Sequence, residues 1–429
     1  MRRDAQDSPA AKRILRRSAR RIASLLRRPE IRALDTLARA RRQRVWIVGG
    51  APRDLLLGRP VLEVDLAVSG DAEPLARALE RRGFGTAVAL SRSVPRVFRV
   101  AGRRELDLVE LAGAKIEEDL ARRDFTVNAM ALEIATHRWL DPFEGARDLV
   151  RGRLRLVAAR NLAEDPLRAL RAARLAATHR LWPDGETTGA CRNVAGDLAR
   201  VAPERIRTEL TKLLEAGEVL PALRWSATAG VLAPALGLEP SSRVEGLARR
   251  LSILDSPALR RCPPQGRRQL RLALIAARLR LSPSDVIVWL AARRFSREEA
   301  GRIARLLELT QSARRIRSSA DAWRWVRDSG AGAKDALRLL RLLHPSQRRR
   351  ARNLGRRAAR PRRGPRVTGS DVLAWLSIPE GPAVGELLRE LELEILRGRV
   401  RNRREARKWL CASTFTQGLP ASRAPAIIR

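Results

Sequence analysis

Apolar and polar positions in the first third of the chain follow the two-residue period of strands and the 3.6-residue period of helices. Residues 45–48 are all apolar and end at two glycines, which predicts a short buried strand followed by a turn. Leucines at helical spacing, followed by a glycine, predict a helix over residues 73–82. Strands are predicted over residues 45–48 and 61–68 and near residues 94–100 and 104–111.

The second predicted strand, residues 61–68, carries two carboxylates. Val64 and Leu66 are expected to face the core. Because side chains alternate along a strand, Glu63 and Asp65 then share the opposite face. The pair alone is typical of a polar strand edge beside a loop.

Gly49, Gly50, Arg53 and Asp54 lie between the two strands and change that interpretation. Mg²⁺ prefers carboxylate oxygens and substrate phosphates as ligands. Glycines let a triphosphate approach the backbone closely, and the arginine would neutralise phosphate charge. Since these requirements coincide in one string, we interpret it as a nucleotide site in which the carboxylate pair holds Mg²⁺.

A third carboxylate is a candidate in the strand predicted near residues 104–111. Leu106 and Leu108 take one face there, and Glu105 and Asp107 take the other. Asp107 is therefore a candidate catalytic residue. A solvated strand face explains the pattern equally well.

Residues 119–132 concentrate unlike polar groups in an otherwise apolar context. Arg122, Arg123, Asp124 and Asn128 are candidates for contacts with the ribose and phosphates of a nucleotide. The alternative is a helix entry with a charged first turn. The density of unlike polar groups favours the site.

Residues 164–177 predict a helix that begins at a proline. Arg168, Arg171 and Arg174 lie three apart on one face of it. In one interpretation the arginines form a solvated stripe and Asp165 is only the N-cap. In the other, Asp165 and Arg168 turn outward together and offer an acceptor beside donors, which matches the edge of cytosine or adenine.

Charge and composition limit the kinds of binding partner and the cellular compartment that we expect. Lysine and arginine number 87 against 47 aspartate and glutamate, and the net charge of +40 suits polyanions, nucleic acid first and anionic membrane second. The three cysteines are isolated, so neither a zinc site nor a disulfide framework is indicated, and a reducing, cytoplasmic setting fits. No apolar run reaches transmembrane length without an arginine, so no membrane span is expected.

The second half of the chain alternates aliphatic residues with arginine at helical period and predicts helices throughout. Its tryptophans are expected to fill contacts between helices rather than to stack on bases. They are Trp289, Trp323, Trp325 and Trp375.

Taken in order, these motifs resemble those of class II tRNA nucleotidyltransferases and bacterial poly(A) polymerases. They are Gly49-Gly50, Arg53-Asp54, Glu63-x-Asp65, Arg122-Arg123-Asp124 with Asn128, Glu164-Asp165 with Arg168, Arg171 and Arg174, and Glu204-Arg205 with Glu209. The resemblance covers about residues 40–216 closely, and the full set in this order is very specific. It implies an α+β fold class: a polymerase-β-like nucleotidyltransferase head, with a mixed sheet and helices, followed by an all-α neck, body and tail.

The resemblance also implies an activity. It is the template-independent addition of C and A to tRNA 3′ ends from CTP and ATP, with release of pyrophosphate. The implied partners are tRNA, through its acceptor arm and 3′ end, and the two nucleotides; the oligomeric state is left open. Glu63 and Asp65 are implied to hold Mg²⁺, and Asp165 and Arg168 to select the base. The implied nucleotide contacts are Gly50, Arg53, Arg123, Asp165, Arg168, Arg171 and Arg174.

On this basis we expect residues 1–35 to form a basic, disordered arm and residues 36–150 to form the head. The parts that follow are a helical neck with the nucleotide-selecting helix (151–216), a helical body (217–346), a basic linker (347–367) and a helical, RNA-binding tail (368–429).

Two departures from the family pattern bear on activity. The family usually has aspartate where Glu63 stands, and the longer glutamate arm shifts a metal whose octahedral geometry is demanding. The segment between Asp107 and Arg122 is short, and in this family a short loop there is associated with enzymes that add only the two cytidines. The alternatives to full CCA addition are therefore CC-only addition, poly(A) addition to other RNAs, and a catalytically weak RNA-binding relative.

Overall fold

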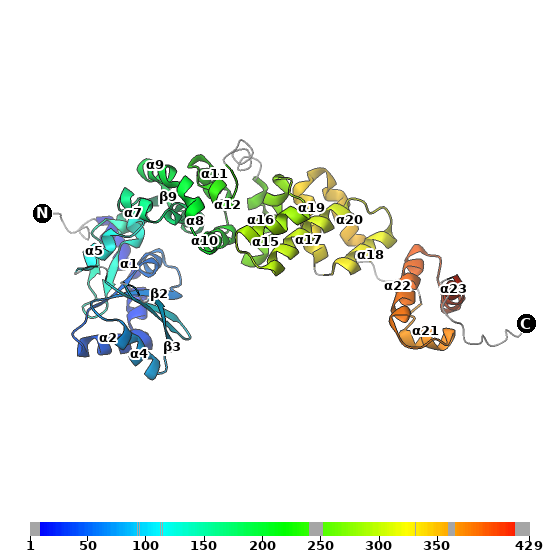
Figure 1. The fold of residues 1–429 in the computed structure, drawn as a ribbon, viewed down its shortest axis with the longest axis horizontal. Helices are drawn as coiled ribbons and strands as arrows, with labels where there is room; N and C mark the ends of the chain where they lie inside the picture. Colours follow the sequence, from blue (N-terminus) through cyan, green and yellow to red (C-terminus); the bar gives the residue numbers. More distant parts are fainter. Residues whose placement is uncertain are drawn as a thin grey trace, which may run out of the picture. The chain divides into compact units, whose positions relative to one another are not determined.

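A computed structural model of the chain describes residues 9–239, 252–358 and 365–416, apart from residues 92, 94, 112, 114 and 331 (Figure 1). The chain forms two compact units. The first comprises Met1–Arg268 with Ala292–Arg294, and the second Gln269–Ala291 with Phe295–Arg429. The division therefore falls inside the segment predicted as the body, residues 217–346.

The first unit contains a mixed sheet. Among the described residues it has seven strands in the order β3-β4-β5-β2-β1-β6-β7, with β2 parallel to β5 and the other neighbours antiparallel. The predicted strands are confirmed to within about three residues at each end. The strands are β1 (Val45–Val48), β2 (Glu63–Val68), β3 (Thr86–Ser91), β4 (Val97–Ala101), β5 (Glu105–Glu110), β6 (Ala131–Glu133) and β7 (Trp139–Leu140).

Strand β2 follows the predicted alternation of faces. Val64 and Leu66 are fully buried, because they face the core of the unit. Glu63 is exposed and Asp65 half-buried on the other face. The sheet thus brings both carboxylates to the surface that a nucleotide could reach.

The pairing register places the turn after β1 beside Asp65. Asp65 pairs with Val48 of antiparallel β1 and with Asp107 of parallel β5. Gly49 follows Val48 directly. The glycine turn and the two carboxylates, which are distant in sequence, therefore share one edge of the sheet.

Helices cover the sheet, and one of them corrects a prediction. The helices are α1 (Pro9–Leu26), α2 (Pro29–Ala40), α3 (Gly50–Leu57), α4 (Glu73–Arg81), α5 (Ile116–Ala121), η2 (Thr126–Asn128) and α6 (Gly145–Arg151). α4 confirms the helix predicted over residues 73–82. The prediction of a disordered arm over residues 1–35 is wrong over its described part. There α1 packs on α3 and α6 and buries Ser18 and Leu25, so its inward face was enough to order it. Residues 1–8 lie outside the described residues.

The rest of the first unit is almost entirely helical. Its central helix is α8 (Leu167–His179), which buries its leucines and alanines against α10 (Pro203–Glu215) and α11 (Leu220–Thr228). The arginines of α8 lie on the remaining face. The other elements are β8 (Arg153–Leu154), α7 (Ala159–Glu164), β9 (Trp182–Pro183), α9 (Gly185–Val194), η3 (Gly196–Arg200), α12 (Leu232–Leu236), η4 (Ser252–Asp255) and α14 (Pro257–Arg260).

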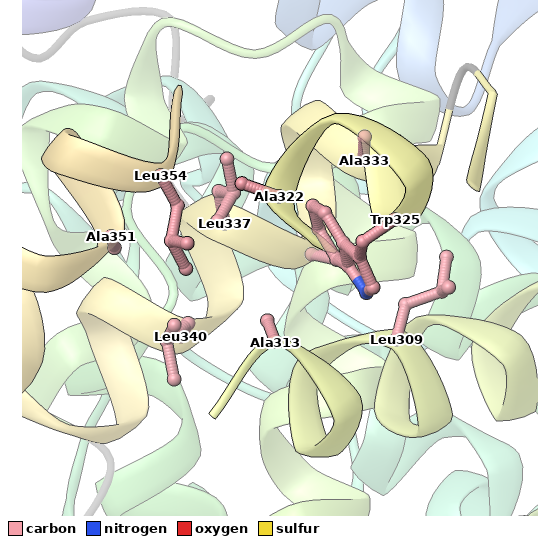
Figure 2. Packing of buried hydrophobic residues seen from close by; sticks show 10 residues of the cluster. Leu309, Ala313, Ala322, Trp325, Ala333, Leu337, Leu340, Ala351 and Leu354 are labelled. Carbon is pink, nitrogen blue, oxygen red and sulfur yellow. The ribbon is translucent and has the colours of Figure 1, made fainter. Parts of the chain in front are cut away.

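Every helix or strand described in the second unit is a helix. Figure 2 shows one of its cores, a cluster of buried residues that includes Trp325, Leu309, Leu337, Leu340 and Leu354. This confirms the expectation for that tryptophan. The elements are α15 (Pro264–Arg278), which the division crosses, then α16 (Pro283–Ala292), α17 (Arg297–Ala313), α18 (Ser319–Ser329), α19 (Gly332–Leu343), η5 (Pro345–Gln347), α20 (Arg348–Ala358), α21 (Gly369–Leu376), α22 (Pro382–Arg397) and α23 (Arg403–Thr416).

The basic linker predicted over residues 347–367 needs a correction. Residues 348–358 form helix α20, because Ala351 and Leu354 recur at helical spacing and pack into the core of Figure 2. Residues 359–364 lie outside the described residues, as do 240–251 of the predicted body and 417–429 of the predicted tail.

The fold class is confirmed as α+β, with a mixed-sheet head followed by helices. In the described part of the chain, no helix is long and apolar enough to cross a membrane.

Candidate active site

A cavity of about 630 Å³ in the first unit gathers most of the predicted site. Twelve of the fifteen candidate residues line it: Gly49, Gly50, Arg53, Glu63, Asp65, Arg122, Arg123, Asp124, Asn128, Arg168, Arg171 and Arg174. The turn after β1, strand β2, the segment after α5, and helix α8 therefore converge on one space. The three candidates outside its lining are Asp54, Asp107 and Asp165.

Gly49 gives the backbone its close approach to Asp65. Its φ is +72° with ψ at −127°, a conformation that side chains other than glycine rarely adopt. A Cβ atom added here would lie only 2.5 Å from Asp65 Oδ2 and 3.2 Å from Arg123 Nη1. The turn fits because this residue has no side chain.

The surroundings of Asp65 disfavour the charged form of its carboxyl group. Burial raises the pKa of its carboxyl group, and the negative charges of Asp107 and Glu63 raise it further, while Arg123 works to lower it. Among the described residues neither Asp65 nor Glu63 accepts a hydrogen bond. The two carboxylates therefore carry negative charge that no hydrogen-bond donor balances.

This donor set fits Mg²⁺. The ion binds through one or two protein carboxylates and completes its shell with water and substrate phosphates. A cation between Glu63 and Asp65 would offset the repulsion that raises the pKa of Asp65. In the described part of the chain no group of three or more histidine, cysteine, aspartate or glutamate side chains could hold a metal alone. Water and substrate phosphates would supply the remaining ligands.

Asp107 is arranged differently from the pair on β2. Arg99 of β4 donates to both of its oxygens, from Nε at 2.7 Å and from Nη2 at 2.8 Å. This bidentate pair already balances the carboxylate and fixes its orientation. Its assignment as a third catalytic carboxylate stays a prediction.

Arg53 is the most buried cation of the cavity lining, with 7 % of its surface exposed. Its Nε and Nη2 donate to the two oxygens of Asp54 at 3.0 and 3.1 Å, and its Nη1 donates to Asn128 Oδ1 at 2.6 Å. Asp54 in turn lies 3.1 Å from His179 Nε2. Asp54 thus supports the site from behind Arg53 rather than lining the cavity.

Asp124 links the head to the arginines of α8. Arg171 Nη1 donates to it at 3.0 Å, Asn128 Nδ2 at 3.0 Å and the Phe125 amide at 2.8 Å. Burial works to raise the pKa of the Asp124 carboxyl, but Arg171 and these donors outweigh burial and hold the pKa below its usual value. Asp124 is therefore a buried, charged anchor for Arg171.

Glu209 of α10 holds the other side of the same arginine face. Arg171 Nε donates to it at 3.4 Å and Arg174 Nε at 2.5 Å. Arg171 and Arg174 both line the cavity, where a triphosphate would meet them.

Asp165 does not cap helix α8. Pro166 is the N-cap, and no side chain caps the helix there. Asp165 Oδ2 instead accepts from Arg205 Nη2 at 2.8 Å. Arg168 Nη1 donates to the Arg122 carbonyl at 2.8 Å, and its buried Nε has no hydrogen-bond partner in the described structure. The interpretation of Asp165 as only an N-cap is wrong, and its role in base selection stays a prediction.

Comparisons with known proteins agree with this geometry. Residues 45–155 match the family model of the poly(A) polymerase head domain, and residues 183–235 match that of a probable RNA- and SrmB-binding site of polymerase A. The chain is 32% identical over 431 residues to the CC-adding tRNA nucleotidyltransferase of Geobacter sulfurreducens, over 93% of this chain and 99% of that one. The chain belongs to the tRNA nucleotidyltransferase and poly(A) polymerase family.

Two further members of the family are similar over most of their length. The CCA-adding enzyme of Geobacillus kaustophilus is 29% identical over 385 residues, which cover 84% of this chain and 90% of that one. The crystal structure of the Bacillus stearothermophilus CCA-adding enzyme in complex with CTP is 25% identical, with a TM-score of 0.67 over 91% of this chain and 99% of that one. The family resemblance predicted from the motifs is thereby confirmed.

Some residues of the cavity were not among the candidates for this family site. Asp119 accepts from Arg123 Nη2 at 2.9 Å and Nε at 3.2 Å, and its position four residues before that arginine on a helical turn was a usable signal. Pro95 and Lys212 also line the cavity, and so does Glu164, which the family motif already includes. No sequence pattern distinguished Pro95 or Lys212, because only the fold brings them there.

Proposed function

We propose that this chain is a tRNA nucleotidyltransferase that extends tRNA 3′ ends from CTP, or from CTP and ATP, without a nucleic-acid template. The observation that carries the proposal is the cavity itself. Two carboxylates without hydrogen-bond donors face several arginines there, an arrangement that suits a metal-bound triphosphate. The near-complete length match to a CC-adding tRNA nucleotidyltransferase supports tRNA as the acceptor.

In this proposal different residues of the cavity bind the metal, the triphosphate and the base. Glu63 and Asp65 would hold Mg²⁺, which would supply charge stabilisation for the transferring phosphoryl group. Arg53, Arg171 and Arg174 would bind and orient the triphosphate, and the charged groups behind them keep their geometry. Asp165 and Arg168 would present hydrogen-bonding groups to the base edge.

The rest of the chain would hold the RNA. The net charge of +40 supports binding through phosphates, and RNA helices are recognised mainly by shape and backbone. These contacts would be independent of the nucleotide cavity, so tRNA affinity and nucleotide affinity should be separable in mutants.

We propose further that addition stops after two cytidines. The connection between β5 and α5 is short, residues 111–115, and the relative matched over nearly its whole length is named as a CC-adding enzyme. Full CCA addition is the alternative, and the two differ only in the fate of a tRNA that already ends in CC.

The test uses purified protein, Mg²⁺ and two tRNA substrates, one ending at the discriminator base and one ending in CC. Addition of two cytidines to the first, without adenylate on the second, is the expected result. Efficient adenylate addition to the second substrate would overturn CC-only addition but keep the broader function. If the parent protein extends neither substrate, or if Asp65→Asn extends them as well as the parent does, the proposed nucleotidyl transfer at this site is wrong.

A further inference from the structure

A hydrogen-bonded chain ties the end of helix α8 to Arg53 in the cavity. His179, in the last turn of α8, places Nε2 3.1 Å from Asp54 Oδ1, although the two residues are 125 positions apart. The His179 side chain is only 8 % exposed. Each oxygen of Asp54 in turn accepts a hydrogen bond from the Arg53 guanidinium. The histidine was not a candidate site residue, and no motif singled it out.

The hydrogen-bond partners of His179 indicate which of its ring nitrogens carries a proton. The ring lies 2.7 Å from Thr178 Oγ1 through Nδ1, and the same hydroxyl lies 2.7 Å from the Arg174 carbonyl. Asp54 is an acceptor, so Nε2 must carry a proton. Burial lowers the pKa of His179 to about 4, which leaves a neutral ring with its one proton on Nε2. The single hydroxyl proton of Thr178 is donated to the Arg174 carbonyl, so Thr178 gives Nδ1 no hydrogen bond while the ring is neutral.

Asp54 transmits this constraint to Arg53. One carboxylate serves two buried donors at once, because Oδ1 accepts from both His179 and Arg53 Nε. Its orientation is therefore set by the ring as well as by the guanidinium. Arg53 Nη1 is held by Asn128 at the other end. Without the ring, the Asp54 carboxylate could rotate about its side-chain bonds, and the Arg53 guanidinium would shift with it.

We propose that His179 is a positioning residue for nucleotide binding: through Asp54 it holds the Arg53 guanidinium toward the triphosphate of the incoming nucleotide. The inference rests on the proposed function for the identity of that ligand. The phosphates are common to all nucleoside triphosphates. The contribution of His179 is therefore independent of the base, unlike that assigned to Asp165 and Arg168.

The alternative is a tie that only stabilises the packing of α8 on the head. The two roles differ in what a mutation changes. A positioning role changes nucleotide affinity and leaves tRNA affinity alone. A purely structural role changes the melting temperature and leaves both affinities alone.

The experiment compares His179→Leu with His179→Gln. Leucine removes both nitrogens, whereas the glutamine amide nitrogen lies as many bonds from Cβ as Nε2 and can still donate to Asp54. Equilibrium dialysis with CTP and with ATP measures nucleotide affinity, filter binding measures tRNA affinity, and circular dichroism gives the melting temperature. Ser226→Ala is the matched control, because Ser226 is a buried hydroxyl on α11 that donates to the Ala222 carbonyl, and α11 also packs against α8.

For His179→Leu we expect CTP and ATP affinity to fall equally, by about tenfold, as for a lost hydrogen bond to a charged group. Affinity for tRNA should stay within about twofold. His179→Gln should recover most of the loss, and Ser226→Ala should lower the melting temperature without changing nucleotide affinity. Unchanged nucleotide affinity in His179→Leu, or equal losses in both His179 variants, overturns the proposal. Because these are binding measurements, a parent protein that binds CTP but fails to extend tRNA would refute the proposed function and leave this inference testable.

Discussion

Replacing Gly49 by alanine tests the centre of the site with a single added carbon. The new Cβ would lie 2.5 Å from Asp65 Oδ2, whereas ordinary contacts of a Cβ begin at 3.4 Å. Either the carboxylate or the turn must therefore move by about 0.9 Å. A displacement of roughly 1 Å at reacting groups costs on the order of 100-fold in rate.

The backbone adds a cost in stability. At a φ of +72° and a ψ of −127°, alanine is strained by roughly 1–3 kcal/mol. For a unit of this size that corresponds to a fall in melting temperature of roughly 2–4 °C per kcal/mol. We therefore expect Gly49→Ala to remain folded at 25 °C and to lose about 100-fold or more in kcat.

The assay is steady-state addition of labelled CTP to tRNA lacking its 3′ end, with circular dichroism on the same preparation. Gly189→Ala is the control, because Gly189 lies in helix α9 with nothing within 4 Å of an added Cβ. It should keep parental kcat and gain roughly 0.5–1 kcal/mol in stability. Parental kcat in Gly49→Ala would refute the reasoning, since it would mean that Asp65 can move without affecting the reaction.

Three further outcomes are expected. Asp165→Ala should reduce the preference for CTP and ATP over UTP and GTP by about 1–3 kcal/mol without lowering the melting temperature, and an unchanged preference in competition assays would contradict the base-edge role. Affinity for tRNA should fall linearly with salt on a log–log plot, as counterions are released from phosphates, and a flat titration would argue against RNA as the main partner. The third outcome concerns pH. His179 has a folded pKa of about 4 against 6.5 unfolded, so between these values the unfolded state binds the extra proton and stability falls as pH falls. In urea unfolding, the parent should lose about 1.4 kcal/mol per pH unit below 6.5 relative to His179→Gln, and a difference that does not change with pH would contradict this. The charged groups that face the ring are Asp54, Arg53 and Arg59.

The period of the strands predicted the positions of the two carboxylates correctly. The alternation along β2 placed Glu63 and Asp65 on one face, and the structure has them there, because one face of that strand must pack on the core. The glycine turn was predictable for a different reason, which is that only glycine allows that backbone beside a carboxylate.

Pairing between distant segments was not predictable from periodicity. Asp107 was predicted as a third carboxylate of the site, and the sequence did not indicate that Arg99 on the neighbouring strand donates to both of its oxygens. Asp165 looked like a possible cap, but Arg205 binds it from a different helix. Each outcome depends on which arginine lies opposite, in a chain that has many of them.

The sequence pattern also did not predict the helix over residues 9–26. Residues 9–26 are so basic that their apolar positions seemed too few to pack. Helix α1 nevertheless buries Leu25 and Ser18 against the head. The surface that orders it belongs to α3 and α6, which local sequence does not describe.

By itself, the sequence determined the local elements and the chemical types of the site, since glycine, carboxylate and arginine each act through properties of the single residue and its nearest neighbours. Tertiary structure alone decided which charges pair, which remain open to a ligand, and that His179 stands behind Arg53. The physical reason is that hydrogen bonds and ion pairs act over a few ångströms, so only the packing of α8 against the head could bring these groups within reach.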